Sequence, residues 1–145
     1  MIALIQRVSR ASVSVDNEEI ASIQAGILLL LGVEKLDDEE NAKNLLQKVM
    51  NYRIFEDEQG KMNLSLLDIK GELLIVPQFT LPANTKKGTR PSFTSAAAPD
   101  LGNRLYEEFI SIAKQKISTV ETGRFGADMQ VSLINSGPVT FWLQK

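Results

Sequence analysis

The stretch GILLLLGVEKLDDEENAKNLLQKVM, Gly26 to Met50, decides the fold class of this chain. Its first part, up to Val33, is a short apolar run, which is typical of a strand buried on both faces. Asp37 and Asp38 then provide a helix N-cap, and the helix that follows ends near Asn51 with its apolar side chains on one stripe. Those side chains are Ala42, Leu45, Leu46, Val49 and Met50. The stretch therefore indicates that a sheet and a helix share one core.

Strands are expected on the N-terminal side of this stretch. Ala3 to Val15 is rich in β-branched residues, and within it Val13 and Val15 face one side while the serines beside them face the other. Asp16-Asn17 is a hairpin turn signal, and Ile20 to Ile23 forms the returning strand. The chain is thus expected to begin with a hairpin that leads into the buried strand.

The remainder of the chain adds strands and one further helix. We expect strands at YRIF (52–55), at Leu64 to Leu67, at ELLIV (72–76) and near Val120, Val131 and Phe141, with an irregular segment from Pro82 to Pro99. Pro99-Asp100 opens the second helix, whose apolar stripe holds Leu101, Leu105, Phe109, Ile112, Ala113 and Ile117. Strict βαβ alternation is absent. The sequence predicts a single α/β domain over residues 1–145, with a mixed, largely antiparallel sheet in barrel-like layers and two main helices.

The composition narrows the function classes. Of 145 residues, 43% are apolar and 23% charged, which are the values of an ordinary soluble domain. No secretory signal is recognisable, and no apolar run is long enough for a bilayer, so we expect a cytoplasmic protein without a membrane partner. The net charge of −2 limits a nucleic-acid partner to a local basic patch.

Cysteine and histidine are both absent. Their absence excludes disulfides, thiol nucleophiles, a Ser-His-Asp triad and the usual zinc ligands. The acidic run DDEE (37–40) lacks the spacing of a calcium loop and is better explained by a helix start. We therefore expect no metal and no cofactor, and catalysis must use carboxylates, hydroxyls, lysines, backbone amides or the substrate itself.

The segment PQFTL (77–81) is the first candidate site. In a strand, Gln78 and Thr80 point to one face while Phe79 points to the other. Pro77 has no N–H and belongs where a strand leaves its sheet. These residues predict a polar pair exposed at the start of the irregular segment, although a half-buried edge strand with one wetted face is the simpler explanation.

Two further segments are candidates. TKKGTRPSF (85–93) gathers Lys86, Lys87 and Arg90, which suits phosphate binding or an ordinary solvated loop. NSGPVTF (135–141) places Gly137-Pro138 between two expected strands, where a tight turn or bulge is the simpler explanation. Glycine also lets the backbone approach a ligand closely, and an X-Pro bond can be cis.

These segments together resemble the bacterial-type D-aminoacyl-tRNA deacylases, the D-tyrosyl-tRNA deacylase family. PQFTL and NSGPVTF carry the likeness, and MIALIQRVSRASVSV, LLLLGVEKLDDEE, YRIFEDEQGKMNL, TRPSF and TGRFGADMQVSL extend it from end to end in family order. The resemblance implies a homodimer with its sites at the subunit interface. It also implies hydrolysis of the ester between a D-amino acid and the 3′ end of tRNA, and removal of glycine from mischarged tRNA.

The resemblance places the first family motif, Ser-Gln-x-Thr-Leu, on this chain. Gln78, Thr80 and Leu81 match it, and Pro77 stands where the family has Ser. A related animal-type deacylase, which removes L-alanine from the wrong tRNA, has Pro at this point, but its Gly-Pro motif differs and is trans. The substitution removes a hydroxyl and an amide hydrogen, so the details of this motif stay open.

The second motif and its partners are also implied by the resemblance. Gly137-Pro138, in the cis form, enters the pocket of the partner subunit as a gate for chirality. Arg7 holds that segment in place. Phe125 and Met129 match positions that flank the terminal adenine of the tRNA.

The expected chemistry is positioning together with oxyanion stabilisation by backbone N–H groups around Phe79 and Thr80. No base clearly activates Thr80 as a nucleophile, and the resemblance favours assistance by the 2′-hydroxyl of the tRNA. If the carbonyl groups of Gly137 and Pro138 fix the substrate's α-amino group, an L-residue clashes while a D-residue or glycine passes.

Three alternatives remain open from the sequence. The protein could bind the tRNA acceptor end without catalysis, edit L-alanyl-tRNA as the animal-type enzymes do, or form a structural dimer with no substrate. Assays of D-tyrosyl, glycyl and L-alanyl esters distinguish them.

Overall fold

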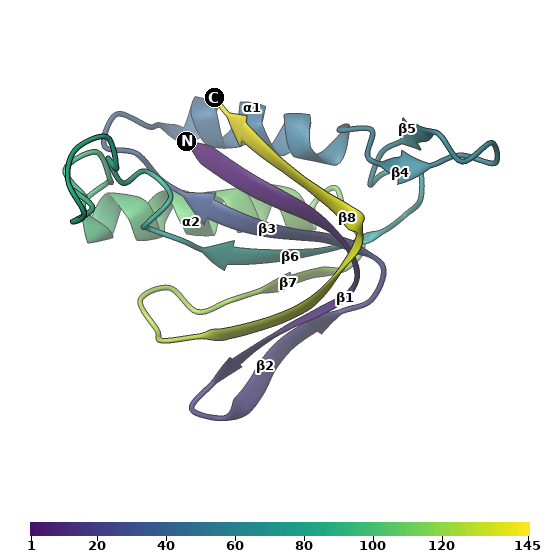
Figure 1. Ribbon diagram of the computed structural model, residues 1–145, viewed down its shortest axis with the longest axis horizontal. Helices are drawn as coiled ribbons and strands as arrows, with labels where there is room; N and C mark the ends of the chain where they lie inside the picture. The colour runs from purple at the N-terminus through teal and green to yellow at the C-terminus, as the bar shows by residue number, and fades with distance from the viewer.

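The sheet is organised around its first strand. β1 (Ile2–Val15) pairs antiparallel with β8 (Gln130–Gln144) along one edge, over nearly its whole length. Along its other edge β1 pairs with β3 (Gly26–Gly32) and then with β2 (Glu18–Ile23), both antiparallel. The computed structural model, which describes residues 1–145, shows these strands side by side in a strongly curled sheet (Figure 1).

Two parallel strands extend the sheet beyond β3. β6 (Glu72–Pro77) pairs with β3, and β7 (Val120–Thr122) pairs with β6. α1 (Glu39–Met50) lies in the connection from β3 to β6, and α2 (Pro99–Lys114) in the connection from β6 to β7. The predicted α/β class is confirmed: the sheet is mixed, antiparallel around β1 and parallel from β3 to β7, with two helices.

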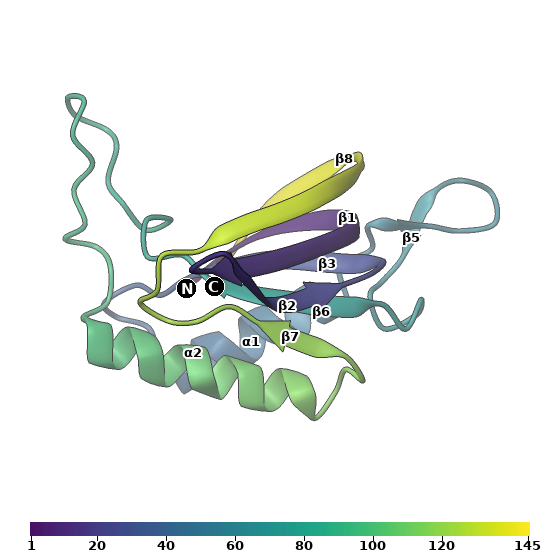
Figure 2. The same ribbon diagram turned by 90° about the horizontal axis from the view of Figure 1, so that it is seen from below.

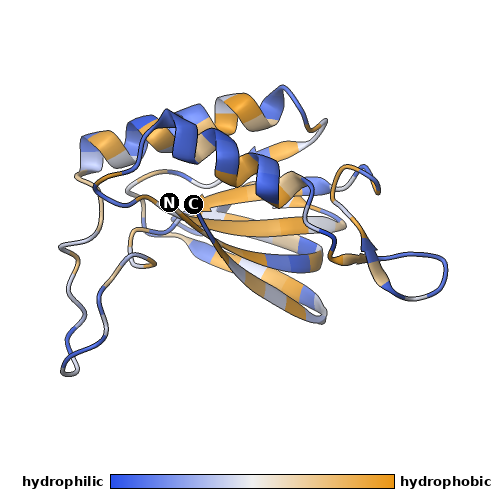
Figure 3. Cartoon of the chain, turned by 90° about the horizontal axis from the view of Figure 1, so that it is seen from above, coloured by the Kyte–Doolittle hydropathy of each residue, from blue (hydrophilic) through white to orange (hydrophobic).

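Both helices pack on the same face of the sheet. α1 buries all five of its predicted apolar side chains, and α2 buries Leu105 and Phe109, in one cluster with Ile5, Leu29 and Ile75 of the strands. Hydrophilic residues occupy the outward faces of the helices (Figure 3). A smaller apolar cluster, formed by Val8, Ala11, Val13, Ala21, Ile23, Leu28, Leu74 and Val76, fills the other face, where the sheet curls. Neither helix has the length and apolar character needed to cross a membrane.

The two strands expected near Val131 and Phe141 are halves of one strand. β8 pairs with β1 on both sides of Gly137-Pro138, with a shift in register between the pairs Val8–Asn135 and Gln6–Thr140. β8 therefore carries more residues than β1 between those pairs. Gly137-Pro138 forms a bulge within a long strand, and the expectation of two separate strands was wrong.

The short strands after α1 also differ from the prediction. β4 (Phe55–Glu56) and β5 (Met62–Leu64) replace the strands expected at 52–55 and 64–67. Ser65 accounts for the second shift, because its N–H and its hydroxyl donate to the Asp68 carboxylate at 2.8 and 2.7 Å. These local bonds turn the chain where a strand was expected.

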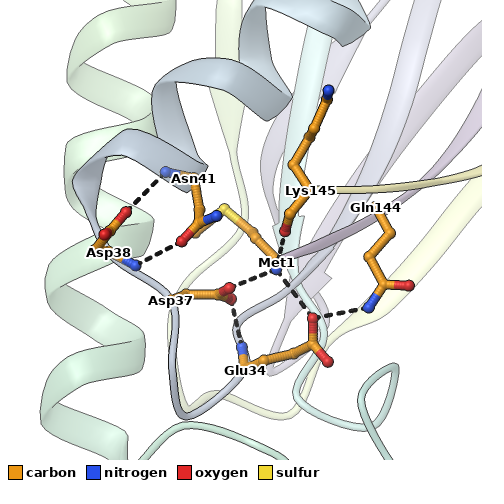
Figure 4. A network of polar contacts seen from close by, with 7 residues as sticks. All are labelled: Met1, Glu34, Asp37, Asp38, Asn41, Gln144 and Lys145. Carbon is orange, nitrogen blue, oxygen red and sulfur yellow. Dashed lines mark hydrogen bonds and ion pairs between the residues drawn. The ribbon is translucent and has the colours of Figure 1, made fainter.

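The first residue is held by ion pairs at one end of the sheet. The Met1 ammonium group lies 3.0 Å from Glu34 Oε2 and 2.5 Å from Asp37 Oδ1, and it donates to the Lys145 carbonyl at 2.6 Å (Figure 4). Asp37 also accepts the Glu34 N–H, at 2.6 Å. The α1 N-cap is Asp38, in a reciprocal pair of bonds with Asn41. Asp37 therefore ties the Met1 ammonium group to the segment before α1, and is not itself the cap.

Replacing Asp37 by asparagine should lower the free energy of unfolding by about 1.5–3 kcal/mol, because a hydrogen bond between charged groups is lost at a buried position. The Asp37 side chain is only 7% exposed. Chemical denaturation measures the change. The matched control is Glu39→Gln, whose ion pair with Arg104 is solvent-exposed and should contribute between about 0 and 1 kcal/mol. Equal effects of the two substitutions would contradict the assignment.

Glu34 adds a pH dependence to the same network. Burial opposes its ionisation, but the hydrogen bonds from Gln144 and from the Met1 ammonium group, with the charge of that group, lower its pKa below the ordinary 4.5. A lowered pKa in the folded state stabilises the fold above the unfolded-state pKa, and the contribution is lost as the pH falls through the folded value. Glu34→Gln should therefore lower stability at neutral pH and have less effect in acid.

Candidate functional site

A cavity of about 550 Å³ opens at the carboxyl end of β6. Its floor is the end of β6, and its walls come from the segment before α2, from the first turns of α2 and from the segment between β7 and β8. Most of its lining is apolar, and Asp128 is its single acidic residue. Such a cavity, apolar with a few polar groups at its rim, is typical of a small-molecule site.

Pro77 ends β6 without breaking the sheet. The Gln78 N–H donates to Leu31 O of β3 at 2.7 Å, whereas the Leu73 N–H donates to Thr119 O on the β7 side at 3.1 Å. Because N–H groups alternate along a strand, the nitrogen of Pro77 faces the β7 side, where β7 has already ended. Proline is therefore accommodated here as a strand-ending residue, as the sequence predicted.

The residues after Pro77 form a turn, and the predicted alternation of faces through PQFTL was wrong. The Leu81 N–H donates to Gln78 O at 3.2 Å, which closes the turn. Gln78 and Thr80 nevertheless meet, because the Gln78 amide donates to Thr80 Oγ1 at 2.6 Å. Phe79, between them in sequence, is 64% exposed.

The turn leaves two backbone donors free at the cavity. The N–H groups of Phe79 and Thr80 make no hydrogen bond within the chain, whereas those of Gln78 and Leu81 do. Two adjacent unpaired N–H groups can stabilise a negatively charged oxygen without reorganisation. Gln78 and Phe79 line the cavity directly, and Thr80 lies beside them through its bond to Gln78.

Aromatic pairs form two of the walls. Phe79 packs against Phe93 with ring centroids 5.4 Å apart, and Tyr106 packs against Phe125 at 6.0 Å. The Tyr106 hydroxyl lies 3.0 Å from Ile75 O and 2.9 Å from Gly123 O, which fixes β6 and β7 to α2. Burial raises the pKa of the Tyr106 phenol above its ordinary value. Tyr106 therefore stays neutral and acts as a structural hydrogen-bond donor.

Glycines leave space for the side chains from the β7–β8 segment. A Cβ at Gly102 of α2 would lie 3.3 Å from the Phe125 ring, and a Cβ at Gly123 would lie 2.9 Å from Met129 Sδ. Phe125 and Met129 can thus reach the cavity, where both contribute to its lining. The sequence prediction missed Gly102, Phe93 and Tyr106; a glycine inside an amphipathic helix, which costs about 1 kcal/mol, was the available signal for the first.

Gly137-Pro138 lies apart from the cavity. Both residues are exposed on β8, the peptide between them is cis, and neither contributes to the cavity lining of the same chain. The Val139 N–H donates to Asn135 Oδ1 at 2.7 Å and closes the bulge. Gly137-Pro138 therefore forms no part of the cavity of its own chain.

Arg7 supports the bulge through hydrogen bonds. Its side chain is buried and donates through Nε to Ser136 O at 3.0 Å and through Nη1 to Ile54 O at 2.8 Å. Nη2 lies 3.4 Å from Glu56 Oε1. These bonds hold the guanidinium group directly behind Gly137.

The fold and the site define an α/β protein with an apolar cavity at the end of a parallel strand, rimmed by free backbone amides. The chain belongs to the D-Tyr-tRNA(Tyr) deacylase family, whose model matches residues 4–144. Relatives named D-aminoacyl-tRNA deacylase from Shewanella sp. (strain W3-18-1) and from Vibrio cholerae (El Tor Inaba N16961) are each 60% identical over 144 residues, which cover 99% of this chain and 99% of the relative.

Solved structures share the same fold. The c-Myc DNA unwinding element binding protein matches with a TM-score of 0.96 and 38% identity, covering 100% of this chain and 99% of its own. A probable eukaryotic D-amino acid tRNA deacylase matches with a TM-score of 0.88 and 18% identity, covering 99% of this chain and 98% of its own. The second likeness shows the fold alone.

Proposed function

We propose that this protein hydrolyses the ester between a D-amino acid and the 3′ end of tRNA, and removes glycine from mischarged tRNA, in the cytoplasm. The observation that carries the proposal is the pair of free N–H groups at Phe79 and Thr80 beside an apolar cavity. The proposal is also supported by the 60% identity, over 99% of this chain, to relatives named D-aminoacyl-tRNA deacylase.

Catalysis would rest on backbone donors. The N–H groups of Phe79 and Thr80 stabilise the oxyanion that forms when water attacks the ester carbonyl, and the Gln78 amide holds the turn through Thr80 Oγ1. The Thr80 hydroxyl makes its one side-chain bond to that amide and has no base beside it. The 2′-hydroxyl of the terminal adenosine then assists the attacking water. An aminoacyl ester is reactive enough for this modest set of groups.

The substrate's adenine would bind between Phe125 and Met129. Both side chains line the cavity, and Phe125 is fixed by its packing against Tyr106. Base stacking on an aromatic ring contributes about 1–3 kcal/mol by alanine substitution. The terminal adenosine is thereby oriented with its ester towards Phe79 and Thr80.

The gate for chirality would come from a second copy of the chain. Gly137-Pro138 is exposed and separate from its own cavity, so only a partner subunit can bring it to a substrate. β8 also has one unpaired edge and exposes Leu133, Ile134 and Trp142. An exposed edge strand with apolar side chains is a surface suited to a protein partner. These features support a homodimer.

Chirality would follow from steric exclusion. If the carbonyl groups of Gly137 and Pro138 hold the α-amino group, the Cα hydrogen of a D-residue faces the gate and its side chain points outward. An L-residue would place its Cβ in that space and clash. Glycine has no Cβ and passes. Exclusion by clash discriminates more sharply than the loss of one attractive contact.

The test is deacylation of four tRNA esters at equal enzyme concentration: D-tyrosyl, L-tyrosyl, glycyl and L-alanyl. D-tyrosyl-tRNA and glycyl-tRNA should be hydrolysed with turnover, and the two L-esters should persist. Equal rates on D- and L-tyrosyl-tRNA would remove the steric gate. Preference for L-alanyl-tRNA would indicate the animal-type editing activity. Stoichiometric protection of the ester would indicate a binding protein. The absence of both hydrolysis and RNA binding would indicate a structural dimer.

A further inference from the structure

The loop between β6 and α2 projects beyond the body of the protein as a narrow arm (Figure 2). Asn84 and Ser92 pair across its stem, with N–H to O distances of 2.8 and 3.1 Å in the two directions. The tip, residues 85–91, is exposed throughout. Gly88 at its centre has φ +68°, and no atom lies within 4 Å of the position of its missing Cβ. The tip is thus a turn that no other part of the chain covers.

The tip carries an unneutralised positive charge. Lys86, Lys87 and Arg90 are its charged residues, and none forms an ion pair within the chain. From Leu73 to Pro99 the sequence contains no acidic residue, although the whole chain has a net charge of −2. Three of the chain's sixteen Lys and Arg residues therefore lie together on one projecting segment, although the net charge of the chain is negative. Such local segregation is the electrostatic footprint of an anionic partner.

The base of the same loop belongs to the cavity. Phe93, Ala96 and Ala97 line it, and Phe93 packs against Phe79 at the catalytic turn. The part of the loop that returns to α2 is fixed to the segment after β3, because the Lys35 N–H donates to Ser95 O at 3.1 Å and the Ala97 N–H donates to Val33 O at 2.9 Å. An extended ligand that leaves the cavity on this side would pass along the arm towards its basic tip.

On the basis of the proposed function, we propose that Lys86, Lys87 and Arg90 bind phosphodiester groups of the tRNA acceptor end, next to the nucleotide that enters the cavity. The partner is a polyanion that continues out of the cavity, and a nucleic-acid backbone has that chemistry. The three side chains lie outside the cavity, so they contribute to binding of the long substrate and not to the chemical step.

The decisive variant replaces all three cations by glutamine: K86Q, K87Q and R90Q in one chain. Two substrates separate binding from chemistry: D-tyrosyl-tRNA and the D-tyrosyl ester of adenosine, which has no phosphate. For the tRNA, KM should rise at least about 10-fold at moderate salt while kcat changes little. The slope of log(1/KM) against log[salt] should become shallower by about two to three units, as expected for three lost phosphate contacts. Hydrolysis of the adenosine ester should be unchanged.

The matched control removes the same charge elsewhere. Lys43, Lys114 and Lys116 are exposed on or just after the helices and line no part of the cavity. Their triple glutamine variant should behave as the wild type on both substrates. Thermal unfolding of both variants checks that each is folded.

Several outcomes would overturn the inference. If the arm variant loses as much activity on the adenosine ester as on the tRNA, the three cations act at the cavity and not on phosphates. If the control variant loses as much activity on the tRNA as the arm variant, the effect comes from net charge alone. A loss of the dimer in the arm variant alone would make a second copy of the chain the partner. If the wild type hydrolyses neither ester, the proposed function fails separately. Binding of uncharged tRNA then tests the arm directly, and an unchanged affinity and salt slope would reject it.

Discussion

Replacing Gly137 by alanine should reduce kcat/KM for D-tyrosyl-tRNA at least about 100-fold, the loss expected when a reacting group is displaced by about 1 Å. Gly137 has φ +129°, a conformation that residues with a Cβ rarely adopt. The added Cβ would lie 2.7 Å from Val139 Cγ2 and 3.0 Å from Arg7 Nη2. Arg7 is tied to Ser136 O and Ile54 O and cannot retreat, so the bulge itself must move.

The matched control is Gly60→Ala. Gly60 also has a positive φ, +74°, but no atom lies within 4 Å of the added Cβ, and the residue is in the β4–β5 turn, away from both cavity and bulge. The Gly60→Ala substitution should lower the free energy of unfolding by about 1–2 kcal/mol and leave deacylation unchanged. Steady-state kinetics, with circular dichroism to verify folding, measure both variants. Wild-type kcat/KM in the Gly137 variant would show that this bulge takes no part in catalysis.

A D-tyrosyl-tRNA that lacks the 2′-hydroxyl of its terminal adenosine should be hydrolysed at least about 100-fold more slowly than the normal substrate. General acid–base catalysis contributes about 10²–10⁴-fold, and the RNA-assisted route assigns this role to the 2′-hydroxyl. The chain has no histidine, and the pKa of the Tyr106 phenol is raised by burial, so it stays protonated. Single-turnover kinetics on chemically charged tRNA give the ratio directly.

Two protein variants complete this experiment. Thr80→Ala and Asp128→Asn remove the hydroxyl and the single carboxylate at or beside the cavity. Each should keep kcat on the normal substrate within about 10-fold, less than a general acid or base is worth. If either variant lowers kcat as much as removal of the 2′-hydroxyl does, that side chain and not the RNA acts as the general acid or base. An unchanged rate on the deoxy substrate would exclude the RNA-assisted route.

Local sequence patterns predict most elements of this fold. The apolar run at Gly26 to Gly32 is a strand buried between β1 and β6, and the stripe in α1 is fully buried. Prediction failed where distant partners decide the outcome. β8 continues through Gly137-Pro138 because β1 pairs with both of its halves, which no local pattern reveals. The turn at Ser65 has a local cause instead: its N–H and its hydroxyl both donate to the Asp68 carboxylate.

The candidate site divides in the same way. Gln78 and Thr80 were expected as a polar pair at the start of the irregular loop, and Gln78 does line the cavity. Phe79, expected as a backbone donor, and Phe125 and Met129, implied by the family resemblance, line it as well. The faces of Gln78, Phe79 and Thr80 were mispredicted, since the strand ends at Pro77, whereas the alternation assumed a strand that continues to Leu81. The free N–H groups of the turn follow from its hydrogen bonds and could not be read from residue types. Likewise, the distance of Gly137-Pro138 from the cavity depends on the order of strands in the sheet.

The pairing of the first strand with the last has a consequence for synthesis on the ribosome. β1 is made first, but one whole edge of it has no partner until residues 130–144 have left the exit tunnel. Until then the guanidinium group of Arg7 lacks Ser136, and the α-ammonium group lacks the Lys145 carbonyl. One edge of this apolar strand therefore stays open to aggregation during translation until β8 has emerged to pair with it.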